Sequence, residues 1–308
     1  METLENTPIR IVIAGLDLTE MDDHIIKYAA LISQALPIEK VFFVHVAQSL
    51  ELPKEVLEKY PDLLAPLDES INSDLQQKID QHFRSSSVET TIIIKEGHAI
   101  QELLRLSKIK EADLMIMGRK RSLKGSGIVT SHIARKSPCT LLLVPMNGKR
   151  TLDKLVVALD YSRHSLLALR TARDMAQKSN SELHLANAFS VPLGFYKTGK
   201  SYEEFVDIMR DNARKHATVV LQSEDLPEGY KTHFLEAERG NYVDPINSFS
   251  HGLAADLIIV GSKGRTNASA ILMGSLAEKL TFKDSDIPLL IVKHKGENMD
   301  FLDTLMRI

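Results

Sequence analysis

The 308-residue sequence contains a single cysteine, Cys139, and no tryptophan. One cysteine excludes an internal disulfide framework and fits a reducing compartment. Cys139 stands just before an apolar segment, so we interpret it as a buried core thiol, with a reactive thiol as the alternative.

Long apolar segments and a basic surplus are also missing. No apolar run reaches the roughly 18 residues that a transmembrane helix needs, and the N-terminal METLENTPIR holds no apolar stretch, which predicts no signal peptide. The formal net charge is −3, whereas proteins that bind nucleic acid or anionic membranes usually carry a basic surplus. We therefore expect a cytoplasmic protein that binds neither.

Signatures of catalytic and metal centres are absent. The 11 histidines are scattered, with no local metal-binding spacing. The sequence has no G-x-S-x-G motif, and its carboxylates form no recognisable acid–base pair. The sequence therefore predicts no fast hydrolytic chemistry.

A glycine-rich segment, ADLIIVGSKGRTNASAILMGSLA at residues 255–277, stands out among what is present. Its apolar start predicts a buried parallel strand. Gly261 and Gly264 follow, and Gly274-Ser275 begins a predicted helix. Glycines allow a ligand to approach the backbone closely, and a helix start offers unpaired N–H groups. We interpret the segment as a phosphate site, although Gly and Ser are also common as simple helix caps.

The sequence contains an internal repeat. Asp17 and Asp160 are 143 positions apart, as are Gly97 and Gly240, and as are residues 112–118 and 255–261. Three landmarks at one offset indicate a duplication, with its join near residues 147–149. We predict domains at residues 1–148 and 149–295 and a tail at 296–308, whose apolar residues pack on the body or on a neighbouring subunit.

Strands and helices alternate in each half, which predicts an α/β fold with two doubly wound, five-stranded parallel sheets in tandem. We expect strands at residues 10–16, 40–47, 88–95, 114–117 and 141–144, and at 155–159, 182–189, 231–236, 257–260 and 289–292. Thr19 and Ser162 are predicted to cap the helix after each first strand. In a strand order of 3-2-1-4-5, ligands bind between strands one and four, which places Asp160 beside Gly261.

The spacing Gly261, Gly264, nine residues, then Gly274-Ser275 matches G-x2-G-x9-G-[S/T]. In this motif the sequence resembles the universal stress protein family, whose ATP-binding members carry it, and the resemblance covers both halves. It implies Rossmann-like domains of the adenine nucleotide alpha hydrolase-like type. It also implies ATP, or ADP or AMP, with or without Mg²⁺, bound over the point where strand order reverses.

The resemblance further implies which residues hold the nucleotide. The adenine end meets Ala158, Asp160 and Ala188. Asp160 would hold Mg²⁺ or the ribose, although it can equally be a turn residue after a strand. The phosphate end is expected to meet Gly261, Gly264, Gly274, Ser275, Leu276 and Ala277, and Val260 is also expected to bind the nucleotide.

The first half departs from this pattern. Arg121 stands in place of the second glycine, the following loop is four residues shorter, and Ile128 replaces the Ser or Thr. We therefore expect no ATP in the first half. Its local basic cluster, formed by Arg119, Lys120, Arg121 and Lys124, is interpreted as a solvated loop.

A second motif competes for the phosphate. Residues 194–201, GFYKTGKS, satisfy the P-loop pattern from Gly194 to Ser201. Residues 190–193 separate it from the preceding strand, and no apolar strand ending in Asp follows it. We interpret it as a coincidental loop, and a P-loop-like ATPase or phosphotransferase that uses Lys200 remains an alternative.

These observations predict an ATP-binding, stress-response protein that acts by binding and signalling. With no evident base for an attacking water, ATP hydrolysis should be slow at most. As the family implies, the two domains are expected to pack as an internal pseudo-dimer through their last strands, and a homodimer of the whole chain is also plausible. An interaction protein that has lost its dependence on nucleotide is the other alternative.

Overall fold

The computed structural model describes residues 6–50, 67–84, 87–119, 126–264 and 273–296. The chain divides into two compact units, between Met146 and Asn147. We call residues 8–146 the N-terminal unit and residues 147–296 the C-terminal unit. Asn6 and Thr7 group with the C-terminal unit, because the Asn6 side-chain amide donates to the Asp174 carboxylate over 2.8 Å.

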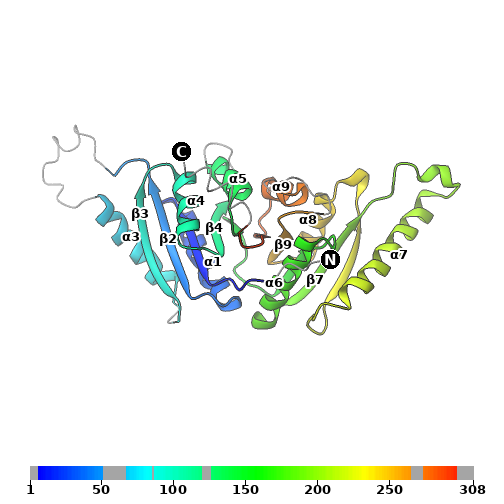
Figure 1. The fold of residues 1–308 in the computed structure, drawn as a ribbon, viewed down its shortest axis with the longest axis horizontal. Helices are drawn as coiled ribbons and strands as arrows, with labels where there is room; N and C mark the ends of the chain where they lie inside the picture. Colours follow the sequence, from blue (N-terminus) through cyan, green and yellow to red (C-terminus); the bar gives the residue numbers. More distant parts are fainter. Residues whose placement is uncertain (1–5, 51–66, 85–86, 120–125, 265–272, 297–308) are drawn as a thin grey trace. The chain divides into compact units, whose positions relative to one another are not determined.

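The N-terminal unit is a five-stranded parallel sheet with helices between successive strands (Figure 1). Its strand order is β3-β2-β1-β4-β5. The elements are β1 (Ile11–Leu16), α1 (Met21–Ala35), β2 (Lys40–Ala47), α3 (Leu67–His82), β3 (Glu89–Glu96), α4 (Ala99–Ile109), β4 (Leu114–Arg119), α5 (Ser126–Lys136) and β5 (Thr140–Pro145).

The C-terminal unit repeats this architecture, with the strand order β8-β7-β6-β9-β10 and parallel pairing. The elements are β6 (Lys154–Ala158), α6 (Arg163–Ser179), β7 (Glu182–Phe189), η1 (Phe195–Thr198), α7 (Tyr202–Leu221), β8 (Lys231–Glu236), η2 (Glu238–Gly240), α8 (Val243–Gly252), β9 (Leu257–Gly261), α9 (Ser275–Phe282) and β10 (Leu289–Val292). The predicted fold class and the predicted order 3-2-1-4-5 are confirmed in both units.

Burial follows the position of each strand in its sheet. The apolar strands β4, β5, β9 and β10 are buried along nearly their whole length, whereas β3 and β8, at the other end of each order, are only half-buried. In the N-terminal unit α1 packs beside α3, and α4 packs beside α5. Right-handed crossovers place these two pairs on opposite faces of the sheet.

A pair of aspartates shows the repeat at atomic detail. The Asp113 carboxylate accepts the backbone N–H groups of Arg10 and Ile11 at 2.9 and 3.0 Å. Asp256, 143 positions later, accepts those of Asp153 and Lys154 at 2.8 and 2.9 Å. Each aspartate thus anchors the start of strand one to the start of strand four in its own unit.

The predicted equivalence of Gly97 and Gly240 was wrong. Gly97 donates its N–H to the last residue of β2, Ala47. In the C-terminal unit the residue that donates to the last residue of β7, Phe189, is Ala237. The counterpart of Gly97 is therefore Ala237, and Gly240 belongs to η2, an insertion of the C-terminal unit.

Both predicted caps are present. Ser162 is the N-cap of α6, and its hydroxyl accepts the Ser165 N–H at 3.3 Å. The Thr19 hydroxyl accepts the Met21 N–H at 3.3 Å at the start of α1, where Glu20 already has helical backbone angles. The same hydroxyl donates to the Asp17 carboxylate over 2.5 Å. The predicted C-terminal tail, residues 296–308, lies almost wholly outside the described residues.

Candidate functional site

Gly261 ends β9 and is buried against α6. A Cβ added there would lie 2.5 Å from the carbonyl carbon of His164 and 2.8 Å from the nitrogen of Ser165. Because these are helix backbone atoms, close packing of β9 on α6 is sufficient reason for a glycine at this position. The predicted phosphate contact of Gly261 stays a prediction.

The two glycines that bracket the loop after β9 contact each other. A Cβ on Gly274 would lie 3.1 Å from the nitrogen of Gly264 and 3.1 Å from Cα of Lys263. The Gly274 N–H donates to the Ser262 carbonyl oxygen over 2.7 Å. The first and last parts of the motif therefore meet, although the intervening residues 265–272 lie outside the described residues.

The start of α9 faces this junction. Gly274 is the N-cap and has no side chain that can accept a hydrogen bond. The first helical bond runs from the Glu278 N–H to the Gly274 carbonyl at 2.9 Å, so the N–H groups of Ser275, Leu276 and Ala277 precede it in the first turn. A helix start of this kind attracts anions, because its first N–H groups have no intrahelical acceptor.

Asp160 follows β6, the strand that pairs with β9, and lies at the same corner as the two glycines. One oxygen of its carboxylate accepts the Ser162 N–H at 2.9 Å. The other oxygen lies 3.0 Å from the position that a Cβ on Gly264 would take. The topology predicted Asp160 beside Gly261, and the strand order in fact brings its carboxylate beside Gly264, three residues further along the same motif.

The predicted adenine-end residues Ala158 and Ala188 lie at the ends of β6 and β7. Ala158 pairs with Val260, and both are buried. Ala188, one residue before the end of β7, is partly exposed.

Asn187, which our sequence analysis overlooked, is buried, and its side-chain amide donates to the Leu159 carbonyl over 2.7 Å. A polar residue within the apolar LHLANAF segment was the signal that pointed to it.

The same corner of the N-terminal unit is filled differently. A Cβ on Gly118 would lie 2.5 Å from Cγ of Met21. Asp22 is fully buried there and accepts the Asp17 N–H at 2.9 Å, and burial raises the pKa of its carboxyl. Residues 120–125, which include Arg121 of the degenerate motif, lie outside the described residues, as does the side chain of Ile128.

The P-loop-like segment does not form a phosphate-binding turn. Phe195–Thr198 is a 3₁₀ turn, and Lys200 is exposed. The Ser201 hydroxyl accepts the Glu204 N–H at 3.1 Å, while the Glu204 carboxylate accepts the Ser201 N–H at 2.8 Å. This capping box occupies the hydroxyl that a P-loop would direct to a metal ion.

Within the described ranges, no group of three or more His, Cys, Asp or Glu side chains is arranged to hold a metal ion. The helices in those ranges are also too short or too polar to cross a bilayer.

The C-terminal unit is a doubly wound α/β domain with a glycine-lined corner at the switch point between β6 and β9.

Comparison with known proteins identifies the family of this chain. The model of the Universal stress protein family matches residues 8–145 and again residues 151–293. The chain therefore belongs to the universal stress protein family and carries two copies of its domain in tandem.

Individual relatives match one copy at a time. Universal stress protein MJ0531 of Methanocaldococcus jannaschii is 28% identical over 148 residues, which cover 48% of this chain and 85% of that protein. Universal stress protein MJ0577 of the same organism is 31% identical over 120 residues, which cover 37% of this chain and 72% of that protein.

Solved structures match the tandem arrangement. A universal stress protein from Archaeoglobus fulgidus aligns with a TM-score of 0.63 at 19% identity, over 92% of this chain and 98% of its own. A functionally unknown protein from Pseudomonas aeruginosa aligns with a TM-score of 0.66 at 17% identity, over 97% and 98%. At these identities the two structures establish the fold alone.

Proposed function

We propose that this protein is an ATP-binding stress-response protein whose C-terminal unit holds the nucleotide at the corner between β6 and β9. The observation that carries the proposal is the meeting of Asp160, Gly264 and Gly274 in front of the α9 start. Gly264 and Gly274 line this corner with backbone atoms, and a Cβ at either position would come close to neighbouring atoms. Membership of the universal stress protein family supports the same assignment.

The phosphates are assigned to the α9 end of this corner. The N–H groups of Ser275, Leu276 and Ala277 lie in the first turn, where the helix dipole also favours an anion. The exposed Ser275 adds a hydroxyl. The Gly274 N–H is excluded from the set of donors, because it already donates to the Ser262 carbonyl.

The ribose and the base are assigned to the opposite side. Asp160 accepts the Ser162 N–H with one carboxylate oxygen, and its other oxygen lies beside Gly264, where a ribose hydroxyl or Mg²⁺ would meet it. Such a Mg²⁺ ion would neutralise phosphate charge, with Asp160 as its protein ligand. Ala158 and Ala188 are small side chains at the strand ends, where an adenine can lie.

We assign binding rather than turnover as the activity, for ATP and equally for ADP or AMP. Hydrolysis needs a base that activates water, whereas Asp160 is assigned here to the ribose or to Mg²⁺ and no other residue is assigned as such a base. The N-terminal unit is not assigned a nucleotide, because the Met21 side chain occupies the space beside Gly118 at its corresponding corner.

Isothermal titration calorimetry of the full chain with ATP tests the proposal. The wild type should bind one equivalent, and Gly274→Val should lose about 100-fold or more in affinity, because a branched side chain would press on the Gly264 backbone. Ser275→Ala provides a milder variant, expected to weaken binding by about tenfold through the loss of one hydroxyl. Circular dichroism melts show whether each variant is folded.

Lys200→Ala is the matched control, because Lys200 is exposed on the rival motif. Unchanged ATP binding in this variant is the expected result. Loss of binding with Lys200→Ala and retention with Gly274→Val would replace the proposal with the P-loop-like alternative. No binding of ATP, ADP or AMP by the wild type would favour a nucleotide-independent interaction protein.

A further inference from the structure

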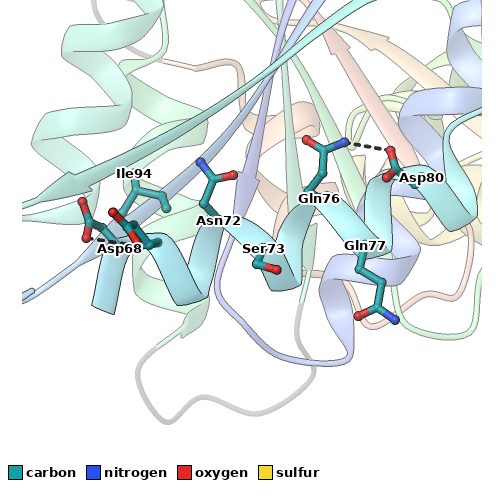
Figure 2. A pocket seen from close by; sticks show the side chains of 8 residues that line it. Asp68, Asn72, Ser73, Gln76, Gln77, Asp80 and Ile94 are labelled. Atoms are coloured by element: carbon teal, nitrogen blue, oxygen red, sulfur yellow. Dashed lines mark hydrogen bonds between the residues drawn. The ribbon is translucent and has the colours of Figure 1, made fainter. Parts of the chain in front are cut away.

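A groove in the N-terminal unit lies away from the glycine corner. Figure 2 shows that it runs along α3, whose polar side chains line it together with one residue of β3. The lining residues are Asp68, Glu69, Asn72, Ser73, Gln76, Gln77 and Asp80 of α3, and Ile94 of β3.

The groove carries uncompensated negative charge. Asp68, Glu69 and Asp80 are exposed, and none of the three forms an ion pair with another described residue. The basic residues of α3 are turned toward α1 instead. Lys78 lies 3.6 Å from the Asp22 carboxylate, and His82 lies 3.7 Å from that of Asp23.

Helix α7, which packs beside β7 and β8 in the C-terminal unit, shows the contrast. Arg210 pairs with Asp207 at 2.6 Å, and Arg214 pairs with Asp211 at 3.1 Å. Two acidic residues of α7, Asp207 and Asp211, are thus paired within their own helix, whereas the α3 side of the groove is lined by carboxylates, amides and one hydroxyl.

The neighbouring strand β3 has an unpaired edge among the described strands. The Glu89 N–H donates to Glu39, and the Gly97 N–H donates to Ala47, both on the β2 side. Since backbone groups alternate along a strand, the N–H and C=O groups of Thr90, Ile92 and Ile94 point away from β2. Ile94 belongs to both features, because it also lines the groove.

We propose that this groove binds an extended, basic segment of a partner protein, which adds to the edge of β3 as a further strand. The main chain of the segment would pair with the outward groups of β3, and lysine or arginine at every second position would face α3. Opposite charge across the groove selects such a segment over acidic or neutral ones.

The repeat distances of the two elements match. Alternate residues of a strand are about 6.7 Å apart, and residues four apart on a helix rise by about 6 Å. Asp68, Asn72, Gln76 and Asp80 follow each other at this helical spacing. A segment with basic residues on alternate positions therefore meets a carboxylate or an amide at each one.

The test uses the full chain and a fluorescent octapeptide of alternating lysine and valine, with binding followed by anisotropy. The triple variant Asp68→Asn, Glu69→Gln, Asp80→Asn should weaken binding by about tenfold. Its matched control is Glu203→Gln, Asp207→Asn, Asp211→Asn on α7, which removes the same charge from the other unit and should leave affinity unchanged.

Two further peptides probe the backbone pairing and the charge. The same octapeptide with alternate N-methylated amides cannot pair with a strand edge and should bind at least about tenfold more weakly. An alternating glutamate–valine peptide should not bind. The proposal is overturned by equal losses in the α3 and α7 triple variants, by full binding of the N-methylated peptide, or by no binding of the lysine peptide.

Discussion

The two units place different atoms at the same corner. In the C-terminal unit, a Cβ on Gly264 would lie against the Asp160 carboxylate, and Gly274, whose Cβ would lie against Gly264, begins α9. In the N-terminal unit, Met21 lies against Gly118, and the Asp22 carboxylate is buried one residue further on. A duplicated scaffold can thus keep its strand order while one copy lines the strand ends with glycine backbone and the other fills them with its own side chains.

The shared features identify what the scaffold itself requires. Asp113 and Asp256 make the same backbone bonds. His45 contacts the Leu16 carbonyl at 3.1 Å, and Asn187 donates to the Leu159 carbonyl at 2.7 Å. A buried polar side chain therefore holds a carbonyl at the end of strand one in each unit, on Leu16 at the end of β1 and on Leu159 just after β6, although one side chain is an imidazole and the other an amide.

The largest expected difference between the two units arises when one methyl group is added at the equivalent glycine of each corner. In Gly261→Ala the new Cβ would meet helix backbone at 2.5 Å, whereas in Gly118→Ala it would meet the flexible Met21 side chain at 2.5 Å. We expect costs in the free energy of unfolding of about 3 and about 1 kcal/mol respectively, measured by urea denaturation. Equal costs would show that the two corners are packed alike.

The equivalent aspartates Asp113 and Asp256 test a feature that the two units share. Asp113→Ala and Asp256→Ala each leave two backbone N–H groups of strand one without their acceptor. We expect each to lower the free energy of unfolding by about 2 kcal/mol. A large loss in one unit and none in the other would contradict the structural equivalence of the repeats.

The smallest expected effect concerns acid stability. His184 and His233 of the C-terminal unit are stacked with ring centroids 5.3 Å apart. The strand registers align them with Phe42 and Ile93 of the N-terminal unit. Burial, the largest cause, lowers the pKa of both histidines from 6.5, and neighbouring Lys231 lowers it further.

The unfolded chain then binds protons that the folded chain does not. The stability contributed by the histidine pair is complete above pH 6.5, and it is lost as the pH falls through the lowered folded-state pKa values. Replacing the pair with the N-terminal residues, as His184→Phe with His233→Ile, should flatten this dependence. Urea midpoints at about pH 7.5 and about pH 5 measure it, and an unchanged slope would assign the acid sensitivity to other groups.

Much of the fold could be predicted from the sequence, because apolar runs of four to eight residues alternate with helical patterns. The strands β2, β7, β8 and β10 have the predicted bounds. Gly97 and Gly240 have the spacing of the repeat but are not equivalent positions. An insertion before α8 compensates for shorter connections earlier in the C-terminal unit, so that the two glycines fall at the common offset. Local sequence spacing cannot distinguish a true counterpart from two compensating changes of length.

Part of the candidate site could likewise be predicted from the sequence, and part could not. The motif Gly261, Gly264, Gly274-Ser275 is visible as a pattern, and the topology correctly placed Asp160 next to it. The separate reasons for each glycine were not visible. Gly261 is required by α6 and Gly274 by the Gly264 backbone, and both partners come from other segments of the chain.

By itself, the sequence determined the class of each element, the duplication and the strand order, because hydrophobic periodicity and chain direction are properties of local residues and their succession. Only the tertiary structure decided which glycines pack and which line a corner, and, among the described residues, which carboxylates on α3 have no cationic partner and which edge of β3 has no neighbouring strand. Those properties depend on distances between segments far apart in the chain, and such distances exist only once the sheet has formed.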